Sequence, residues 1–276
     1  MKQIRGMLAL VTGAASGIGR ATALELAREG CRLALVDVNA DRLGEVRREV
    51  ESLGAECSTH VVDVSCRDSI ASLGSELEIS GGVDILANVA GVAVGGTVVD
   101  TTLDDWDWII GINLMGPINT IGTFLPGMVL RGRGHVVNVS SLGGLCAVPG
   151  LGAYSTTKFG LAGLSETMHI ELKGTGVGVT LVCPGLTNTR LHEQFRLRGI
   201  PREMVDWAVE HFMPRMFSAE KTGYLIVRAI KRNRFIVMTT LFAKFNYFLK
   251  RLSPILYRGM WRAIYRVTDA LKNRRY

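Results

Sequence analysis

The chain has 276 residues and a mass of 30.0 kDa, with 47% hydrophobic and 21% charged residues. This composition predicts one large domain or two small ones with a substantial core, and it excludes disordered, collagen-like and coiled-coil proteins. The net charge of +7 is uneven: residues 221–276 carry fourteen Lys and Arg against one acid, and the preceding 220 residues carry 18 against 24, which indicates a C-terminal segment attracted to anionic surfaces.

The chain begins with a short polar segment that leads directly into an apolar run. Met1–Gly6 has neither the apolar core nor the cleavage site of a signal peptide, and no stretch of about 18 residues is continuously apolar. The five cysteines form no C-x-x-C pair, and the five histidines form no pair at metal-ligand spacing. We therefore expect a cytoplasmic protein with reduced thiols and no bound metal.

Short apolar strands alternate with helices along most of the chain. We predict strands over residues 7–12, 32–37, 57–63, 83–88, 135–140, 177–183 and 234–239. Helices are predicted over residues 17–29, 41–53, 104–130, 154–173 and 219–232. This alternation predicts a single α/β domain over residues 1–240, with a doubly wound parallel sheet of about seven strands flanked by helices.

A glycine-rich loop, TGAASGIG at residues 12–19, connects the first predicted strand to the first helix. Residues without side chains let the backbone approach a pyrophosphate, and the N–H groups of the helix start favour its charge. The loop residues expected to bind the cofactor are Gly13, Ser16, Gly17, Ile18 and Gly19. Asp37 ends the next strand, where a carboxylate accepts hydrogen bonds from a ribose diol and repels a 2′-phosphate. Ser16 is not basic, so we predict NAD rather than NADP.

Two later segments support the same cofactor site. Asp63 and Val64 close the third predicted strand, where the carboxylate is expected to meet the adenine amino group. Asn88, Val89, Ala90 and Gly91 close the fourth strand, at the carboxyl edge where open α/β sheets bind ligands. From this second segment we predict cofactor contacts at Asn88, Ala90 and Gly91.

A phenol and an ammonium group share one face of a predicted helix. Tyr154 and Lys158 stand at positions i and i+4, and Ser141 precedes Tyr154 by 13 residues. Oxidation of an alcohol requires a base for the hydroxyl proton, and a neighbouring cation lowers the pKa of tyrosine toward neutrality. Ser141 is predicted to hold the substrate oxygen, and Asn113 to distort its helix and hold a water that links Lys158 to solvent.

In these motifs the chain resembles the short-chain dehydrogenase/reductase family over residues 7–240. Gly13, Gly17 and Gly19 match its T-G-x-x-x-G-x-G loop, and Asn113, Ser141, Tyr154 and Lys158 match its catalytic tetrad. The stretch with Pro184, Gly185, Thr187 and Thr189 matches the segment that contacts the nicotinamide carboxamide. The resemblance implies a Rossmann-type domain, contacts of the cofactor with Asp37, Asp63, Tyr154 and Lys158, and a homodimer or homotetramer. Val89 departs from the family's N-N-A-G motif.

In this family the segment after Gly185 forms a lid over the substrate, here about residues 187–217. Its aromatic and methionine residues suit a bulky apolar ligand or pack the lid onto the body; they are Leu191, Phe195, Leu197, Trp207, Phe212, Met213, Met216 and Phe217. We therefore predict NAD-dependent interconversion of a lipophilic secondary or allylic alcohol, such as a steroid or retinoid, and its carbonyl. The alternatives are a 3-oxoacyl-thioester reductase or 3-hydroxyacyl dehydrogenase, and a non-catalytic NAD-binding scaffold.

Residues 241–276 form a predicted basic, amphipathic helical extension. Ser253 and Pro254 start a helix whose apolar stripe comprises Leu256, Met260, Ile264, Val267 and Leu271, flanked by Tyr257, Trp261 and Tyr265. Arg258, Arg262 and Arg266 lie opposite this stripe. This pattern is typical of an interfacial helix that makes peripheral membrane contact. Packing on the body or on a partner subunit is the alternative, and no nucleic acid is expected.

Overall fold

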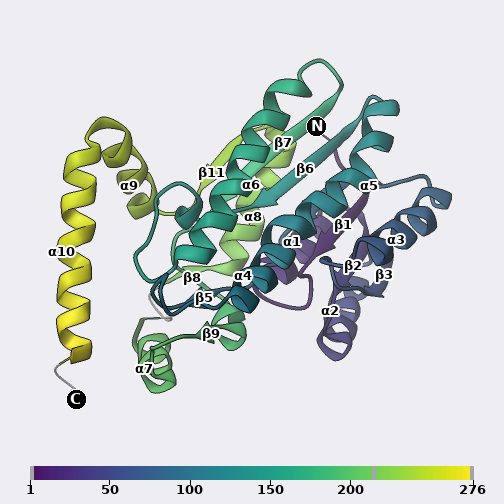
Figure 1. The fold of residues 1–276 in the computed structure, drawn as a ribbon. Coiled ribbons are helices and arrows are strands. Elements are labelled where there is room, and N and C mark those ends of the chain that lie inside the picture. The colour runs from purple at the N-terminus through teal and green to yellow at the C-terminus, as the bar shows by residue number, and fades with distance from the viewer. Residues whose placement is uncertain (1–2, 213–215, 274–276) are drawn as a thin grey trace.

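The computed structural model describes residues 3–212 and 216–273, without the side chains of residues 208, 209, 212 and 267–273. Seven parallel strands form one sheet in the order β11-β7-β6-β4-β1-β2-β3 (Figure 1). They are β1 (Leu8–Thr12), β2 (Arg32–Asp37), β3 (Cys57–Val61), β4 (Ile85–Asn88), β6 (Gly134–Val139), β7 (Val177–Cys183) and β11 (Ile236–Met238). The predicted doubly wound sheet is confirmed.

The strand order reverses between β1 and β4. From β1 the chain adds β2 and β3 on one side, then crosses to β4 and continues through β6, β7 and β11 on the other. In open α/β sheets, ligands bind beyond the carboxyl ends of the strands at such a switch point. The glycine-rich loop follows β1 and residues 89–91 follow β4, so both predicted cofactor segments lie at this position.

Helices cover both faces of the sheet because side chains of each strand alternate between two apolar clusters. Ala9 and Val11 of β1 pack with residues of α1, α2 and α8, whereas Leu8 and Leu10 pack with residues of α3, α5 and α6. A strand buried on both faces is apolar throughout, as β1 is. These helices are α1 (Gly17–Arg28), α2 (Ala40–Ser52), α3 (Arg67–Ile79), α5 (Gly116–Leu130), α6 (Gly152–Glu171) and α8 (Ala219–Arg232).

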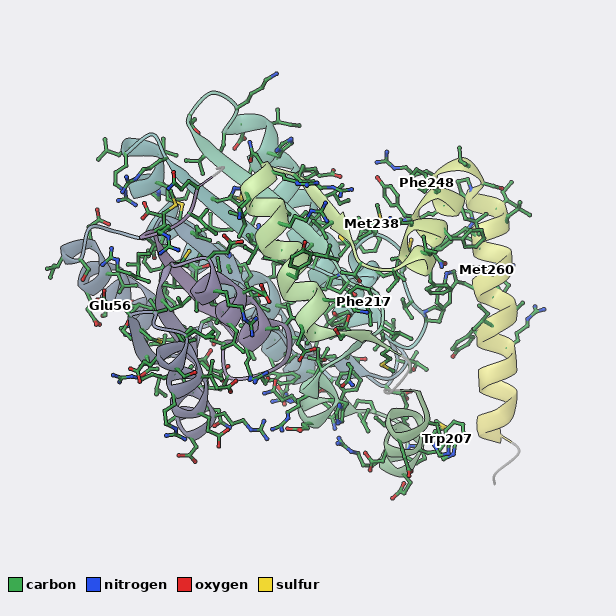
Figure 2. The ribbon with its side chains drawn as sticks, turned by 180° about the vertical axis from the view of Figure 1, so that it is seen from behind. Glu56, Trp207, Phe217, Met238, Phe248 and Met260 are labelled. Carbon is green, nitrogen blue, oxygen red and sulfur yellow. The ribbon has the colours of Figure 1, made fainter. Side chains whose placement is uncertain are left out.

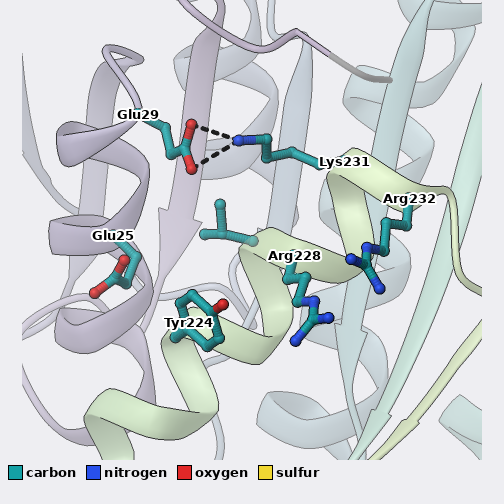
Figure 3. Close-up of a pocket in the computed structure, with 7 residues that line it drawn as sticks. Glu25, Glu29, Tyr224, Arg228, Lys231 and Arg232 are labelled. Carbon is teal, nitrogen blue, oxygen red and sulfur yellow. Dashed lines mark hydrogen bonds and ion pairs between the residues drawn. The ribbon is translucent and has the colours of Figure 1, made fainter.

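The backbones of α1 and α8 pack close together. A Cβ atom on Gly223 of α8 would lie 2.7 Å from the Ala21 backbone of α1, so glycine is required at this crossing. Farther along the pair, Lys231 donates hydrogen bonds to both carboxylate oxygens of Glu29 at 2.8 Å. These two residues line a surface hollow of about 310 Å³ (Figure 3), to which none of the predicted site residues contributes.

One continuous helical run, Leu103–Leu130, consists of α4 (Leu103–Ile110), the π-helical turn η1 (Gly111–Met115) and α5. Thr102 and Asp105 start the run with reciprocal capping hydrogen bonds. Among the described residues, this is the helix whose length and hydropathy would suffice to span a membrane. Phe124 and Met128 of this run are buried in the core beneath the sheet, so it is a core helix of the domain.

Most predicted elements are observed within two residues of their predicted bounds. β2, β7 and α8 coincide with the prediction, whereas β3, β4 and β11 are shorter. α3 was not predicted, because serine and glycine interrupt the apolar pattern of residues 67–79 and lower its helical propensity. Its buried residues Ile70, Leu73 and Leu77 nevertheless cover the sheet, which shows that tertiary packing stabilises this helix.

The lid is built from short elements: β8 (Thr187–Asn188), the 3-10 helix η3 (Arg190–Gln194), β9 (Arg196–Leu197), α7 (Arg202–Phe212) and β10 (Phe217–Ser218). β8 pairs with β10, so the two ends of the lid are joined. β9 pairs with β5 (Val94–Gly95), which follows β4. Backbone hydrogen bonds therefore join the lid to the body beside the candidate site.

Two helices follow the sheet, α9 (Leu241–Leu252) and α10 (Pro254–Asn273). The predicted helical extension is thus observed through residue 273. Figure 1 shows α10 along one side of the body, with α7 of the lid at the level of its C-terminal end. We call residues 241–273 the tail.

The buried side of α10 differs from the apolar stripe predicted to begin at Leu256. Tyr257, predicted on the flank, is buried, and Met260 packs beside it against the body (Figure 2). Leu256 is 64% and Ile264 43% exposed. Tyr257 lies on the side of α10 that faces the body because an aromatic ring buries a large apolar area and its hydroxyl finds an acceptor there. That the other residues form one apolar stripe stays a prediction. The side chains of Val267 and Leu271 lie outside the described part of the chain, and so does the whole of Met213.

Candidate active site

The glycine-rich loop turns tightly between β1 and α1. Gly13 and Gly17 have positive φ angles of 65° and 52°, a region that favours glycine. A Cβ at Gly13 would lie 2.7 Å from the Ala90 backbone, and one at Gly19 would overlap the Gly13 carbonyl oxygen. The backbone of the loop is therefore packed against residues that follow β4, as a pyrophosphate cradle requires.

Ser16 occupies the position before α1, and its carbonyl accepts the hydrogen bond from Arg20 N–H at 3.0 Å. Its hydroxyl does not cap the helix within the described chain, so the first N–H groups of α1 face the loop. Ile18 packs its side chain against the core. Of the loop residues predicted to bind the cofactor, Ser16 therefore has its side chain at the helix start, whereas the side chain of Ile18 is packed in the core and only its backbone is available.

Asp37 lies at the carboxyl end of β2, next to the loop. Its carboxylate accepts hydrogen bonds from the N–H groups of Ala15 and Asn39, both at 3.0 Å. These bonds hold a negative charge beside the place where the loop would cradle a dinucleotide. The structure thus brings Asp37 and the glycine-rich loop together as predicted.

Asp63 and Val64 follow β3, which ends at Val61 rather than at Asp63. The Asp63 carboxylate accepts hydrogen bonds from Ser65 N–H at 2.8 Å and Ser65 Oγ at 2.7 Å. Val64 is buried against Gly116, and its carbonyl accepts a hydrogen bond from Asn119 at 3.0 Å. The exposed Asp63 carboxylate retains acceptor capacity toward the adenine end of the site.

Asn88 is buried with both ends of its amide occupied. It donates to Asn138 Oδ1 at 2.9 Å and accepts from Thr120 Oγ1 at 2.6 Å. The side chain therefore braces β4, β6 and α5, and only its backbone is available to a cofactor. Ala90 and Gly91 do face the site: Ala90 meets Gly13, and a Cβ at Gly91 would lie 3.2 Å from Asn113 Oδ1 and 3.3 Å from Lys158 Nζ.

Thr12 was not among the predicted site residues, yet it joins the two cofactor segments. Its hydroxyl accepts hydrogen bonds from Val89 N–H at 3.0 Å and Ala90 N–H at 3.2 Å. Because these bonds use only backbone groups of the later segment, the valine at position 89 does not disturb them. The Thr-Gly pair at the start of the loop motif was the signal that could have identified Thr12.

Ser141 follows the carboxyl end of β6, and Tyr154 lies in the first turn of α6. The Ser141 hydroxyl hydrogen-bonds the Tyr154 phenol, which lowers the pKa of the phenol, but burial raises that pKa more strongly. Ser141 Oγ also accepts Gly143 N–H at 3.0 Å, and a Cβ at Gly143 would lie 3.3 Å from the Tyr154 ring. The catalytic pair predicted from the sequence is thus in contact.

Lys158 is 4% exposed and lies on the same face of α6. Its ammonium donates to the Val139 carbonyl at 3.0 Å and stands 5.8 Å from the centroid of the Tyr154 ring. Burial lowers the pKa of Lys158 to about 8, because the charged form loses hydration. A cation near a phenol favours the phenolate.

Asn113 lies in the π-helical turn η1, which confirms the predicted distortion of the long helix. Its amide donates to Val92 O at 2.9 Å and to Thr157 Oγ1 at 3.2 Å, and its oxygen accepts Val92 N–H at 2.8 Å. These bonds tie the turn to the segment after β4 and to α6. π-helical turns frequently occur at functional sites.

Pro184 and Gly185 connect β7 to the lid. The Pro184 carbonyl accepts Leu142 N–H at 2.8 Å, directly beyond Ser141. The Gly185 carbonyl accepts the Thr187 hydroxyl at 3.1 Å. Thr189 lies over the glycine-rich loop, since a Cβ at Gly17 would be 3.1 Å from Thr189 Cβ. This segment thus extends from the neighbourhood of Ser141 to the glycine-rich loop.

A buried carboxylate attaches the lid to α4. Asp105 is fully buried, and it accepts hydrogen bonds from Arg198 Nε at 2.6 Å and Nη2 at 2.8 Å. The Arg198 guanidinium holds the pKa of Asp105 well below its usual range. Arg196 stacks on the Trp108 ring at 3.9 Å. The sequence analysis missed this attachment, because its partners are 93 residues apart.

The Tyr154 ring borders an apolar cluster on the substrate side. Val94, Ile109 and Ala153 form its buried part, and Trp106 and Trp108 pack against it. Of the predicted apolar lid residues, Leu197 approaches the backbone of β5, where a Cβ at Gly95 would lie 3.3 Å from its Cδ2. Trp207 is 54% exposed. The phenol that is predicted to react therefore has an apolar surface on one side.

Among the described residues, no group of three His, Cys, Asp or Glu is arranged to hold a metal ion. The glycine cradle and the free acceptor positions of Asp37 fit a dinucleotide, because the close backbone contacts at Gly13 and Gly19 leave no room for side chains. The residues brought together by the fold therefore fit a nicotinamide dinucleotide beside a phenol, an ammonium group and a hydroxyl.

Comparison with known proteins agrees with this geometry. The model of the short chain dehydrogenase family matches residues 7–198. The chain is 34% identical over 193 residues to the 3-oxoacyl-[acyl-carrier-protein] reductase FabG of Thermotoga maritima, covering 70% of this chain and 78% of the relative. It is 33% identical over 235 residues to the probable oxidoreductase EphD of Mycobacterium tuberculosis, covering 82% of this chain. The match spans only 40% of the length of EphD.

Among solved structures, a short chain dehydrogenase/reductase from Burkholderia phymatum in complex with NAD is similar. The TM-score is 0.83 at 30% sequence identity, and the match covers 93% of this chain and 96% of that one. The similarity therefore covers nearly the whole chain.

Proposed function

The chain belongs to the short-chain dehydrogenase family, and on that premise we propose that it is an NAD-dependent oxidoreductase interconverting a lipophilic secondary or allylic alcohol and its carbonyl. The observation that carries this proposal is the contact of Ser141 with Tyr154, with Lys158 on the same helix face. These three residues lie beside the segment after β4 that packs against the glycine-rich loop.

In this proposal Tyr154 removes the hydroxyl proton of the alcohol, and the nicotinamide supplies the hydride acceptor when bound. Ser141 donates a hydrogen bond to the substrate oxygen as negative charge develops there. Lys158 favours the phenolate of Tyr154 and so opposes the rise in the pKa of the phenol that burial causes. Asn113 holds the turn that faces Lys158, where a water would pass the proton to solvent.

The cofactor is proposed to be NAD. The carboxylate of Asp37 lies beside the loop and accepts from a ribose diol, whereas a 2′-phosphate would meet a like charge. The remaining contacts are proposed for the backbone or side chains of Gly13, Ser16, Gly17, Ile18, Gly19, Asp63, Val64, Asn88, Ala90, Gly91, Tyr154, Lys158, Pro184, Gly185, Thr187 and Thr189. NADP is the alternative cofactor that the assay below distinguishes.

The apolar cluster beside Tyr154 supports a lipophilic substrate. Trp106 and Trp108 pack within it, and Arg196 covers the Trp108 ring from the lid. A surface of this kind stabilises an apolar ligand by removing it from water, at about 25 cal/mol per Å² of apolar area. A short polar alcohol would gain little there, so we expect kcat/KM to rise with the apolar area of the substrate.

The test is NADH or NADPH formation at 340 nm with purified full-length protein. The panel comprises hydroxysteroids, retinols, 3-hydroxyacyl thioesters and short alcohols, each with NAD⁺ and with NADP⁺. Turnover of a bulky apolar alcohol with NAD⁺ is the expected result. Turnover of thioesters alone, or of NADP⁺ alone, would contradict the proposed substrate or cofactor.

A second candidate function is 3-oxoacyl-thioester reduction or 3-hydroxyacyl dehydrogenation, favoured by the similarity to FabG. The substrates of these reactions are attached to a long polar carrier. The carrier would have to extend past the lid, because it is too long to lie beneath it. A third interpretation, a non-catalytic NAD-binding scaffold, would be favoured if NADH bound while no alcohol in the panel reacted. The intact Ser141, Tyr154 and Lys158 oppose it.

We also propose that the protein is cytoplasmic and makes peripheral contact with anionic membranes through residues 241–276. One face of α9 exposes apolar side chains: Leu241, Phe242, Phe245, Phe248 and Leu252 are 52–83% exposed (Phe248 is labelled in Figure 2). Lys244 beside them and Arg258 and Arg262 on α10 are exposed too. Apolar side chains bordered by cations bind an anionic lipid surface.

Co-sedimentation with vesicles tests this contact. We expect binding to phosphatidylcholine vesicles with 30% phosphatidylglycerol, weak binding without it, and loss of binding in the double variant Phe245→Gln and Phe248→Gln. Ile79→Gln is the matched control, because Ile79 is an apolar residue on the body that is 88% exposed. Absence of wild-type binding would contradict the proposal, and a change in oligomeric state of the double variant would indicate a partner subunit on this face instead.

We further propose a homodimer or homotetramer. Ile118 and Val129 of α5 and Ile170 of α6 expose apolar side chains on neighbouring helices. Burial of such a surface stabilises association. Light scattering of the purified protein should give two or four times the mass of the chain, and a monomer at micromolar concentration would contradict the proposal.

A further inference from the structure

The loop that follows the catalytic serine is held from two sides. Residues 142–147 contain the 3-10 helix η2 (Leu142–Gly144) and connect Ser141 to the segment before α6. On one side the loop lies against α6, where a Cβ at Gly144 would be 2.5 Å from the Lys158 carbonyl oxygen. On the other side it meets the tail.

Two side chains of the tail donate hydrogen bonds to carbonyl groups of this loop. Lys250 of α9 donates to Leu145 O at 2.7 Å, and Tyr257 of α10 donates to Ala147 O at 2.9 Å. The Lys250 ammonium also stands 4.4 Å above the ring of Phe159, which follows Lys158 on α6. The tail is therefore bonded to two carbonyl groups of the segment between η2 and α6.

Apolar packing reinforces the same contact. Leu142, Leu145 and Cys146 of the loop are buried in one cluster with Ala243 of α9 and Tyr257 of α10. Tyr257 is only 7% exposed although it belongs to the last helix of the chain. A buried hydroxyl that finds an acceptor stabilises the contact, and its removal leaves that acceptor unpaired.

We propose that Lys250 and Tyr257 are positioning residues for Ser141: the tail holds residues 142–147 so that the serine hydroxyl stays against the Tyr154 phenol. The inference rests on the proposed function, because it concerns the residues assigned there to catalysis. Ser141 accepts Gly143 N–H at 3.0 Å and hydrogen-bonds Tyr154. A loop that shifts at Leu145 therefore moves the hydroxyl at the other end of η2.

The variants Lys250→Met and Tyr257→Phe remove one hydrogen bond each while they keep most of the packing volume. We expect each to lower kcat severalfold and the double variant about tenfold, since small displacements of a catalytic group carry large rate penalties. KM for NAD⁺ should stay within about twofold, because the two altered side chains bond to residues 145 and 147 and, within the described part of the chain, not to the glycine-rich loop. Lys250→Arg, which retains a donor, should restore most of the rate.

Matched controls are Lys221→Met, an exposed lysine of α8, and Tyr224→Phe, a tyrosine of the same helix that is 52% exposed. Both should behave as wild type. If the double variant loses thermal stability but keeps kcat, the contact only anchors the tail and the positioning role is wrong.

A second readout needs no turnover. Because the Ser141 hydrogen bond lowers the pKa of the Tyr154 phenol, the double variant should raise that pKa. Ultraviolet titration near 295 nm measures it, with Tyr154→Phe in each background subtracted to isolate the one phenol. An unchanged pKa overturns the positioning role, and a raised pKa supports it even if no alcohol in the panel reacts, in which case only the proposed function fails.

Discussion

The cofactor side and the substrate side of the candidate site are held by different kinds of contact. On the cofactor side, the contacts are made to the backbone: Gly13 lies against the Ala90 backbone, and the Thr12 hydroxyl accepts hydrogen bonds from two backbone N–H groups after β4. On the substrate side, single side chains bridge distant segments, as Arg198 does to Asp105 and Lys250 to Leu145. The first kind excludes almost every substitution, whereas the second can be altered one residue at a time, so we expect substrate specificity to change more readily than cofactor binding.

The largest effect is expected on the cofactor side from Gly19→Ala. The added Cβ would overlap the Gly13 carbonyl oxygen, so the loop must open. We expect NADH affinity, measured by fluorescence titration, to fall at least about a hundredfold, or about 2.7 kcal/mol. Gly44→Ala is the matched control: its Cβ meets nothing within 4 Å, and it should stabilise α2 by about 0.5–1 kcal/mol. An unchanged NADH affinity in Gly19→Ala would contradict the claim that the cofactor side tolerates fewer substitutions than the substrate side.

A second variant, Lys158→Met, concerns a residue between the cofactor side and the substrate side. The pH dependence of its stability tests whether the Lys158 ammonium is desolvated in the folded protein. The folded-state pKa of Lys158 is lowered to about 8 from an ordinary 10.5, so between these values the unfolded chain binds more protons than the folded one. The free energy of unfolding attributable to Lys158 must therefore rise with pH in this window, by about 2 kcal/mol from pH 7.5 to 9.5. Well below pH 8, Lys158 is protonated in both the folded and the unfolded state, and burial of its charge then lowers the free energy of unfolding by its full amount.

Urea denaturation of wild type and Lys158→Met at the two pH values measures this difference, because the other titrating groups cancel between the proteins. The wild type should gain stability relative to the variant as the pH rises. Parallel stability curves would mean that the ammonium is not desolvated in the folded protein.

A smaller effect, about tenfold, is expected from Asp37→Asn. The amide oxygen still accepts a hydrogen bond, but the negative charge that repels a 2′-phosphate is gone. The ratio of kcat/KM for NAD⁺ over NADP⁺ should fall by about a factor of ten. Asp41→Asn, an exposed acid in the first turn of α2, should leave the ratio unchanged. A ratio that stays constant in Asp37→Asn would show that Asp37 does not select the cofactor.

On the substrate side, Asp105→Asn should act on substrate binding. The variant keeps the shape and the capping position but loses the charge that holds Arg198. We expect KM for the alcohol to rise about fivefold with kcat nearly unchanged, which is the pattern for lost uniform binding. Asp104→Asn, exposed on the same turn, is the control. A loss confined to kcat would place Asp105 in the chemistry rather than in the lid.

The same contrast explains what the sequence could predict. Gly13 to Gly19 and the pair Tyr154 and Lys158 are close together along the chain, so spacing alone placed them correctly. The direction of the Asn88 amide, the partner of Asp105 and the buried face of α10 depend on residues 32 to 110 positions away. Local periodicity carries no information on such partners, and so Tyr257 was predicted on a flank although it is buried.

The central claim is that Tyr154 is the base of a dinucleotide-dependent alcohol oxidoreductase. The most direct measurement compares wild type with Tyr154→Phe in two quantities: kcat with NAD⁺ and the best alcohol of the panel, and NADH affinity. The account predicts a loss of at least about 10³-fold in kcat with NADH affinity within about twofold. A variant that retains kcat within about tenfold, or that loses NADH binding along with turnover, would contradict it.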